Sequence, residues 1–102
     1  MRRVLLRQVA LDELADIIEF IADDKPGAAH RVLAAVEQCI AHITVFPESA
    51  PPLTNVLRHE LYGIRRAVVT PHRTIVLFYF TDDNLIDIVS IRRAEQSNDW
   101  LK

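Results

Sequence analysis

The sequence predicts an α+β fold, in which a short first strand and an antiparallel helical hairpin pack on an antiparallel three-strand meander. Two segments of the first half carry apolar residues at helical spacing. The stretch from Leu57 to Arg93 differs, because strand-forming apolar segments alternate there with two short turns. A chain of 102 residues can build one compact core. We therefore expect residues 1–102 to form a single domain.

The first half opens with Arg2–Arg7, whose three central apolar residues are too few for a helix and predict a short strand. Gln8–Asp23 has apolar residues three and four positions apart, which predicts an amphipathic helix. Pro26 suits the start of a second helix, which is expected to run to about Val45. Because the connection is short, the two helices should be antiparallel neighbours. Four acidic residues are expected on the face of the first helix opposite the apolar one: Asp12, Glu13, Asp16 and Glu19.

The second half begins after Phe46-Pro47, which ends the second helix. Gly63 indicates a bulge or bend in the chain that follows. The last strand is apolar enough for both of its faces to be covered. The expected extended segments are Leu57–Val69, Arg73–Thr81 and Leu85–Ile91, and Ala94–Lys102 is expected to be a tail or a short helix.

Charge and composition exclude several classes of protein. The formal net charge is −2, and it is unevenly distributed. Residues 57–102 contain seven basic and six acidic residues, whereas residues 1–56 contain five basic and eight acidic residues. This is not the strongly basic balance of a protein that binds nucleic acid mainly through phosphates. A single cysteine, Cys39, cannot form an internal disulfide. The apolar runs are far shorter than the roughly 20 residues that span a bilayer, so we expect a cytoplasmic protein without a membrane partner.

The order of these elements, together with a few residues, resembles the RelE/ParE superfamily of bacterial toxins. Phe46-Pro47 closes the second helix, Arg73 leads into an aromatic strand that contains Phe78-Tyr79, and an acidic turn precedes the final apolar strand. The resemblance extends from Val4 to Arg93. It implies a toxin encoded beside an antitoxin, in a type II toxin–antitoxin module that arrests growth when the antitoxin is degraded. RelE-like members cut messenger RNA in the ribosome, whereas ParE-like members inhibit DNA gyrase.

Cleavage of RNA through its 2′-hydroxyl needs a base, an acid and cations that stabilise the charged phosphorane. By resemblance to RelE-like toxins, the cations would be Arg65 or Arg66, Arg73 and Arg93. Arg92 adds a further cation, and these arginines are expected to be able to converge at one end or face of the meander. Arg73 has an equally simple structural interpretation, because an arginine at a strand start is often an edge charge or the partner of an acid such as Glu60.

The acid and base of a nuclease are harder to find. Many RNA-cleaving relatives have a histidine or tyrosine after the last strand, where this chain has neither. Trp100 lies near that place, but an indole does not exchange a proton at neutral pH. It is a candidate for stacking, for packing or for contact with an antitoxin. His72, Tyr79 and Glu60 remain as acid or base candidates. The histidines lack close ligand spacing, so no metal is predicted. The sequence has no glycine-rich phosphate loop, and no cofactor is predicted.

We therefore favour a ParE-like toxin over a RelE-like ribonuclease. The acidic balance, the long helical hairpin and the missing acid or base after the last strand favour binding to a protein. The expected partners are a cognate antitoxin, which would cover exposed apolar surface, and DNA gyrase, with the ribosome and messenger RNA as the alternative. The toxin and the antitoxin could form a hetero-oligomer. A second alternative is that the chain has the toxin fold but no toxicity and acts only as a binding or regulatory protein. The expected target-binding residues are Arg73, Arg92, Arg93 and Trp100.

Overall fold

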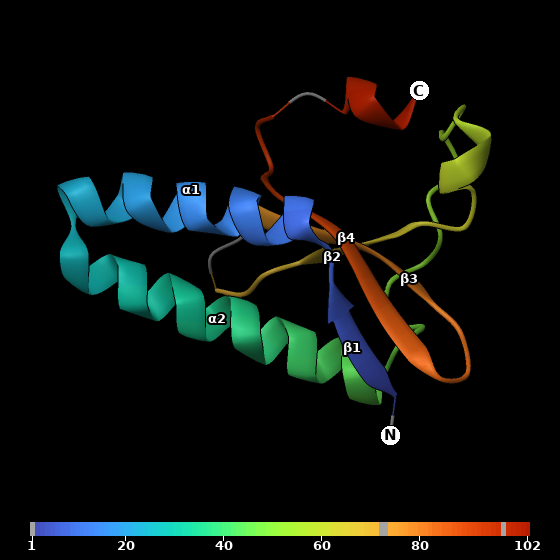
Figure 1. The fold of residues 1–102 in the computed structure, drawn as a ribbon, viewed down its shortest axis with the longest axis horizontal. Coiled ribbons are helices and arrows are strands. Elements are labelled where there is room, and N and C mark those ends of the chain that lie inside the picture. The colour runs from blue at the N-terminus through green and yellow to red at the C-terminus, as the bar shows by residue number, and fades with distance from the viewer. Residues whose placement is uncertain (1, 72–73, 97) are drawn as a thin grey trace.

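The computed structural model describes residues 2–71, 74–96 and 98–102. They form a four-stranded sheet with two long helices, as predicted (Figure 1). Pro26 stands at the start of the second helix, where its missing N–H costs no hydrogen bond. The elements in chain order are β1 (Arg3–Leu6), α1 (Gln8–Asp24), α2 (Pro26–Val45), the 3₁₀ turn η1 (His59–Leu61), β2 (Arg65–Val68), β3 (Ile75–Thr81), β4 (Leu85–Arg93) and the 3₁₀ turn η2 (Asp99–Leu101).

The strands lie in the order β1-β4-β3-β2. The three-strand meander is antiparallel as expected, whereas β1 pairs in parallel with β4 at the outer edge. The register of β3 and β4 shifts at Phe78/Tyr79, which marks a bulge. Because β1 pairs only with residues 85–88, no strand of the described residues lies on that side of the remainder of β4. This open part of β4 is the place where the candidate functional site lies.

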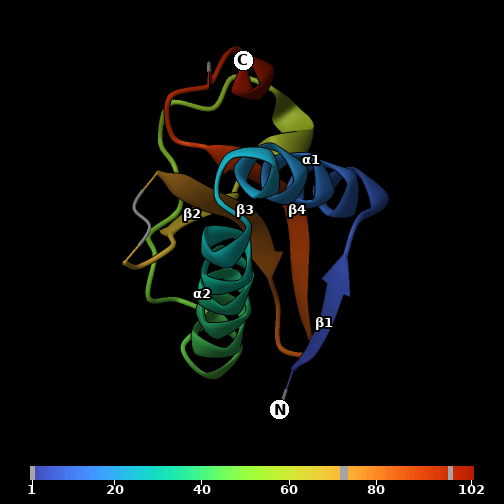
Figure 2. The ribbon, with the colours of Figure 1, turned by 90° about the vertical axis from the view of Figure 1, so that its left-hand side faces the viewer.

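The two helices are antiparallel neighbours and cover one face of the sheet (Figure 2). Their apolar stripes meet the strand residues that point to the same face, and Val36, Leu77 and Tyr79 there are fully buried. Among the described residues, no helix is long and apolar enough to cross a membrane.

The second face of the sheet is covered by the chain itself. Leu61 and Ile64, from the segment between α2 and β2, pack on Phe78 together with Leu101 of η2. The amides of Leu57 and Arg58 both donate hydrogen bonds to the carbonyl oxygen of Leu101, at 3.2 and 3.3 Å, and so tie this segment to the end of the chain. The second face is therefore not open to an antitoxin, because its apolar residues fill a second core. This agrees with the expectation that both faces of the last strand are covered.

Two strand boundaries also differ from the prediction. Leu57–Val69 is not extended throughout, since η1 interrupts it and only Arg65–Val68 joins the sheet. Gly63 makes the bend between them with φ at 90°, a left-handed conformation that glycine adopts without strain. At the other end, β4 continues past Ile91 to Arg93. Backbone pairing with the start of β3 allows these polar residues to extend the strand.

Candidate functional site

The two arginines of β2 point to opposite faces of the sheet. Arg65 faces the helices, as does its register partner Tyr79, and its Nη1 donates a hydrogen bond of 2.6 Å to the carbonyl oxygen of Ala50. Arg66 faces the second core together with its partner Phe78. Its guanidinium has no hydrogen-bond or ion-pair partner within the described part of the chain. Arg65 is thus held in a structural contact, while Arg66 is free to bind a ligand.

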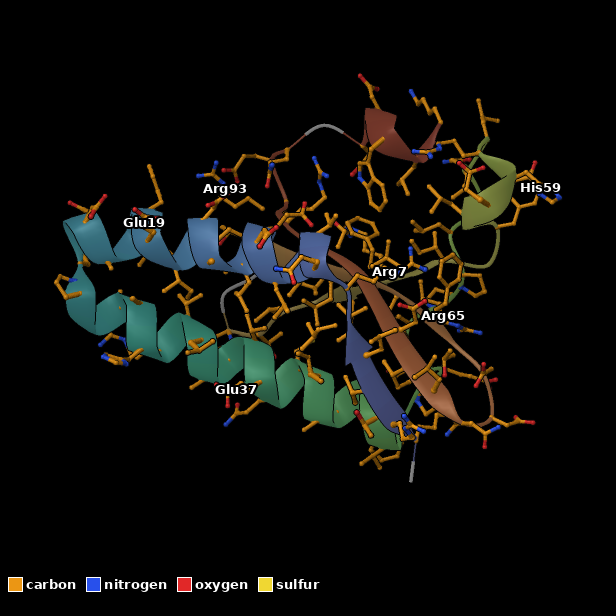
Figure 3. The ribbon with its side chains drawn as sticks, viewed as in Figure 1. Arg7, Glu19, Glu37, His59, Arg65 and Arg93 are labelled. Carbon is orange, nitrogen blue, oxygen red and sulfur yellow. The ribbon has the colours of Figure 1, made fainter. Side chains whose placement is uncertain are left out.

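The two arginines of β4 diverge in the same way. Arg93 reaches over α1, where its guanidinium carbon lies 5.1 Å from the centre of the Phe20 ring. Arg92 turns to the second face, where its guanidinium carbon lies 5.3 Å from the centre of the Trp100 ring. Figure 3 shows Arg93 above α1 and Arg65 well apart from it among the strands. The expectation that the arginines converge is therefore wrong for these four, since side chains alternate between faces along a strand.

Trp100 packs against the second core. Its ring meets that of Phe78 edge-on at 5.0 Å, and the guanidinium of Arg92 lies over its face. Within the described residues, its Nε1–H is buried and unpartnered, as is Nε of Arg92. Of the roles considered for Trp100, this geometry favours packing.

Glu13 connects α1 to the open part of β4. Its carboxylate accepts hydrogen bonds from the hydroxyl of Ser90 at 2.8 Å and from the amide of Ile91 at 3.3 Å. Its Oε2 also lies 3.4 Å from Nη1 of Arg92, and both side chains are about three-quarters buried. The expectation that Glu13 lies on the solvent face of α1 is therefore wrong. The one hint in the sequence is Ser90, a polar residue in an otherwise apolar stretch of strand.

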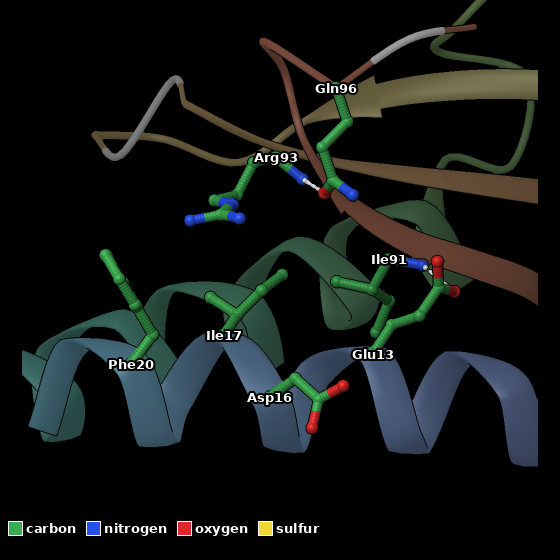
Figure 4. Close-up of a pocket in the computed structure, with 7 residues that line it drawn as sticks. All are labelled: Glu13, Asp16, Ile17, Phe20, Ile91, Arg93 and Gln96. Atoms are coloured by element: carbon green, nitrogen blue, oxygen red, sulfur yellow. Dashed lines mark hydrogen bonds between the residues drawn. The ribbon is translucent and has the colours of Figure 1, made fainter.

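A pocket of 270 Å³ opens beside Glu13, between α1 and the end of β4 (Figure 4). We call it the α1–β4 pocket. Its apolar floor contains the buried side chains of Ile17 and Ile91. Phe20, at its rim, is 66% exposed, with the guanidinium of Arg93 over its ring. The pocket is lined by Glu13, Asp16, Ile17, Phe20, Ile91, Arg93 and Gln96.

Arg93 forms one wall of the pocket, and its backbone is fixed by Gln96, whose Oε1 accepts a 2.7 Å hydrogen bond from the Arg93 amide. Nε of Arg93 lies 3.7 Å from Oε1 of Glu95. Glu13 and Asp16 on α1 add negative charge to the lining of the same pocket. The pocket thus combines an exposed aromatic ring, an arginine and an apolar floor. Such a set is typical of the centre of a protein–protein interface.

The other acid and base candidates have unsuitable positions or fall outside the description. Tyr79 is fully buried, its hydroxyl donates a 2.8 Å hydrogen bond to the carbonyl oxygen of Pro47, and burial raises its pKa. Glu60 is exposed, and a hydrogen bond from its own backbone amide, followed by one from Arg58, lowers its pKa. His72 and Arg73 lie outside the described residues. Among the described residues, no three metal-binding side chains lie together.

Comparisons with known proteins agree with this architecture. The family model described as the ParE toxin of the type II toxin-antitoxin system, parDE, matches residues 4–98. A solved structure described as the chromosomal ParDE TA system from P. aeruginosa is 16% identical in sequence and superposes with a TM-score of 0.74, covering 93% of this chain and 98% of that chain. No curated protein matches. The extent of the family match establishes that the chain belongs to the ParE toxin family of type II toxin–antitoxin systems.

Proposed function

We propose that this ParE-type toxin arrests growth in the cytoplasm by inhibiting DNA gyrase and is neutralised by a cognate antitoxin. The observation that carries the proposal is the division of the arginines between the two faces of the sheet. A ribonuclease needs its cations around one phosphate, with an acid and a base in reach. Arg65 and Arg93 instead belong to one face, and Arg66 and Arg92 to the other. This arrangement supports binding to a protein target.

The α1–β4 pocket is the surface that we assign to the target. Arginine and aromatic residues dominate the binding energy of many protein interfaces. Phe20 and Arg93 are already stacked on each other, so little side-chain entropy is lost when a partner covers them. Arg92 and Trp100 act indirectly, because their contacts with Glu13 and Phe78 hold the end of β4 in place. Arg73 remains a further proposed contact.

A separate exposed surface supports a second protein partner. Val45 and Phe46, at the end of α2, are 62% and 57% exposed. Together with Arg2, which leads into β1, they line an open hollow of 620 Å³. We assign this hollow to the antitoxin, since it leaves the α1–β4 pocket to the target.

Two assays on the purified protein test the proposed function. The first measures inhibition of gyrase supercoiling, and the second measures transcript cleavage in a translation reaction. We expect supercoiling to be inhibited, transcripts to stay intact, and the co-purified antitoxin to restore supercoiling. Transcript cleavage with normal supercoiling would replace the proposal by a RelE-like ribonuclease. Activity in neither assay would indicate a member of the fold without toxicity.

A further inference from the structure

A second cavity, of 300 Å³, lies on the face of the sheet opposite the helices. It is bounded by the loop 53–56, by Arg66 of β2 and by the end of the chain. We call it the C-terminal cavity. The hydrogen bonds from Leu57 and Arg58 to Leu101 hold two of its walls together. The α1–β4 pocket shares no lining residue with it.

The polar residues of the C-terminal cavity all carry hydrogen-bond donors. Among the described residues that line it, none has a carboxylate side chain. In the α1–β4 pocket, by contrast, Glu13 and Asp16 would repel an anion. The five polar lining residues are two cations, Arg66 and Lys102, and three neutral residues, Thr54, Asn55 and Asn98.

Arg66 is the central cation of this set. It is partly buried, and no acid within the described residues pairs with it. Lys102 is more exposed, and its Nζ lies 3.7 Å from Oδ1 of Asp99. Phe78, Val56 and Leu101 supply apolar, buried surface to the same cavity. Such surface excludes water, which strengthens the attraction between a cation and a bound anion.

We propose that the C-terminal cavity binds a phosphate group, either as free phosphate or as the monoester of a nucleotide. A phosphate monoester carries close to two negative charges at neutral pH and has three strong acceptor oxygens. The guanidinium of Arg66 matches two of these oxygens, and the ammonium and amide donors can satisfy the third. The acidic balance of the whole chain disfavours a nucleic-acid strand. This site is independent of the proposed inhibition of gyrase.

Amide NMR spectroscopy of the full chain tests this site. Inorganic phosphate and adenosine monophosphate are titrated separately, while chloride keeps the ionic strength constant. We expect saturable shifts at Thr54, Asn55 and the indole N–H of Trp100, the only tryptophan. Tighter binding of the nucleotide would identify a monoester ligand, and equal binding would identify the phosphate group alone.

Variants make this test decisive. Arg66→Gln should weaken phosphate binding about tenfold, because it removes a charge-assisted pair of hydrogen bonds. Lys102→Gln should weaken it less and cannot disturb the core, since that side chain is 62% exposed. Arg31→Gln, on the exposed surface of α2, is the matched control and should bind as the wild type does. Shifts that stay linear in phosphate, or that are unchanged in both cavity variants, would overturn the proposal.

Discussion

The carboxylate of Glu13 accepts a 2.8 Å hydrogen bond from the hydroxyl of Ser90, although the two residues lie 77 positions apart. Ser90 is 2% exposed, so this contact satisfies a polar group that water does not reach. The same carboxylate accepts a hydrogen bond from the amide of Ile91, beside which the described residues place no strand on that side. Glu13 therefore takes the place of a missing strand and fixes α1 against the end of β4.

Replacing Glu13 should destabilise the fold. Glu13→Ala leaves the Ser90 hydroxyl and the Ile91 amide without their partner, and we expect the free energy of unfolding to fall by about 1–3 kcal/mol. Urea denaturation followed by circular dichroism measures this change. Asp16→Ala, one turn along on an exposed position, should shift it by less than about 0.5 kcal/mol. Equal effects of the two variants would mean that Glu13 has no special role.

The helices were predictable because their signals are local. Apolar residues at helical spacing and the proline at the start of α2 act within a few turns of chain. The place of β1 beside β4 was not predictable in this way, since it depends on pairing between residues about 80 positions apart. The sequence also did not indicate which segments cover the second face of the sheet. These are the loop before β2 and the end of the chain, which meet only in the folded protein.

The candidate site was predictable in part. The sequence singles out Arg93, and Arg93 lines the α1–β4 pocket. Its contact with a target stays a prediction. Phe20 and Glu13 were not predicted, because a phenylalanine on a helix is normally buried and a glutamate normally solvated. Only the path of β4 across α1 decides that Phe20 is exposed and Glu13 is enclosed.

Trp100 should act as a packing residue. Trp100→Ala removes the edge-on contact with Phe78 and uncovers Arg92, so we expect a loss of about 2 kcal/mol in the free energy of unfolding, less than for a fully buried ring. Trp100→Phe keeps most of the contact and should lose less than half of that. Thermal denaturation compares the two variants. A Trp100→Ala protein that is as stable as the wild type would assign the ring to partner binding.

Stability should fall at alkaline pH. Burial raises the pKa of the Cys39 thiol above its ordinary value of 9.0 and that of Tyr79 above 10.0. The unfolded chain therefore releases these protons first, and above about pH 9 it binds fewer protons than the folded chain. The contribution of these two protonated groups to stability is complete below that pH. It is lost as the pH rises through their pKa values in the folded chain.

Urea denaturation between pH 7 and pH 11 measures this loss, and two variants assign it. Cys39→Ala should reduce the fall in the free energy of unfolding that begins near pH 9. Tyr79→Phe should reduce the fall that begins near pH 10. Tyr79→Phe also loses the hydrogen bond to Pro47, at a cost of about 1 kcal/mol at neutral pH. A free energy of unfolding that stays constant up to pH 11 would contradict the expectation.

The rim of the α1–β4 pocket should control inhibition of the target without controlling the fold. Arg93→Ala and Phe20→Ala change partly or largely exposed side chains, so thermal stability should stay close to that of the wild type. If the pocket meets gyrase, each variant should raise the concentration that half-inhibits supercoiling by about tenfold, the effect of losing one interface hot spot. Arg31→Ala removes an exposed arginine from α2 and serves as the control, with unchanged inhibition expected. Full inhibition by a folded Arg93→Ala, Phe20→Ala double variant would place the gyrase contact on another face of the toxin.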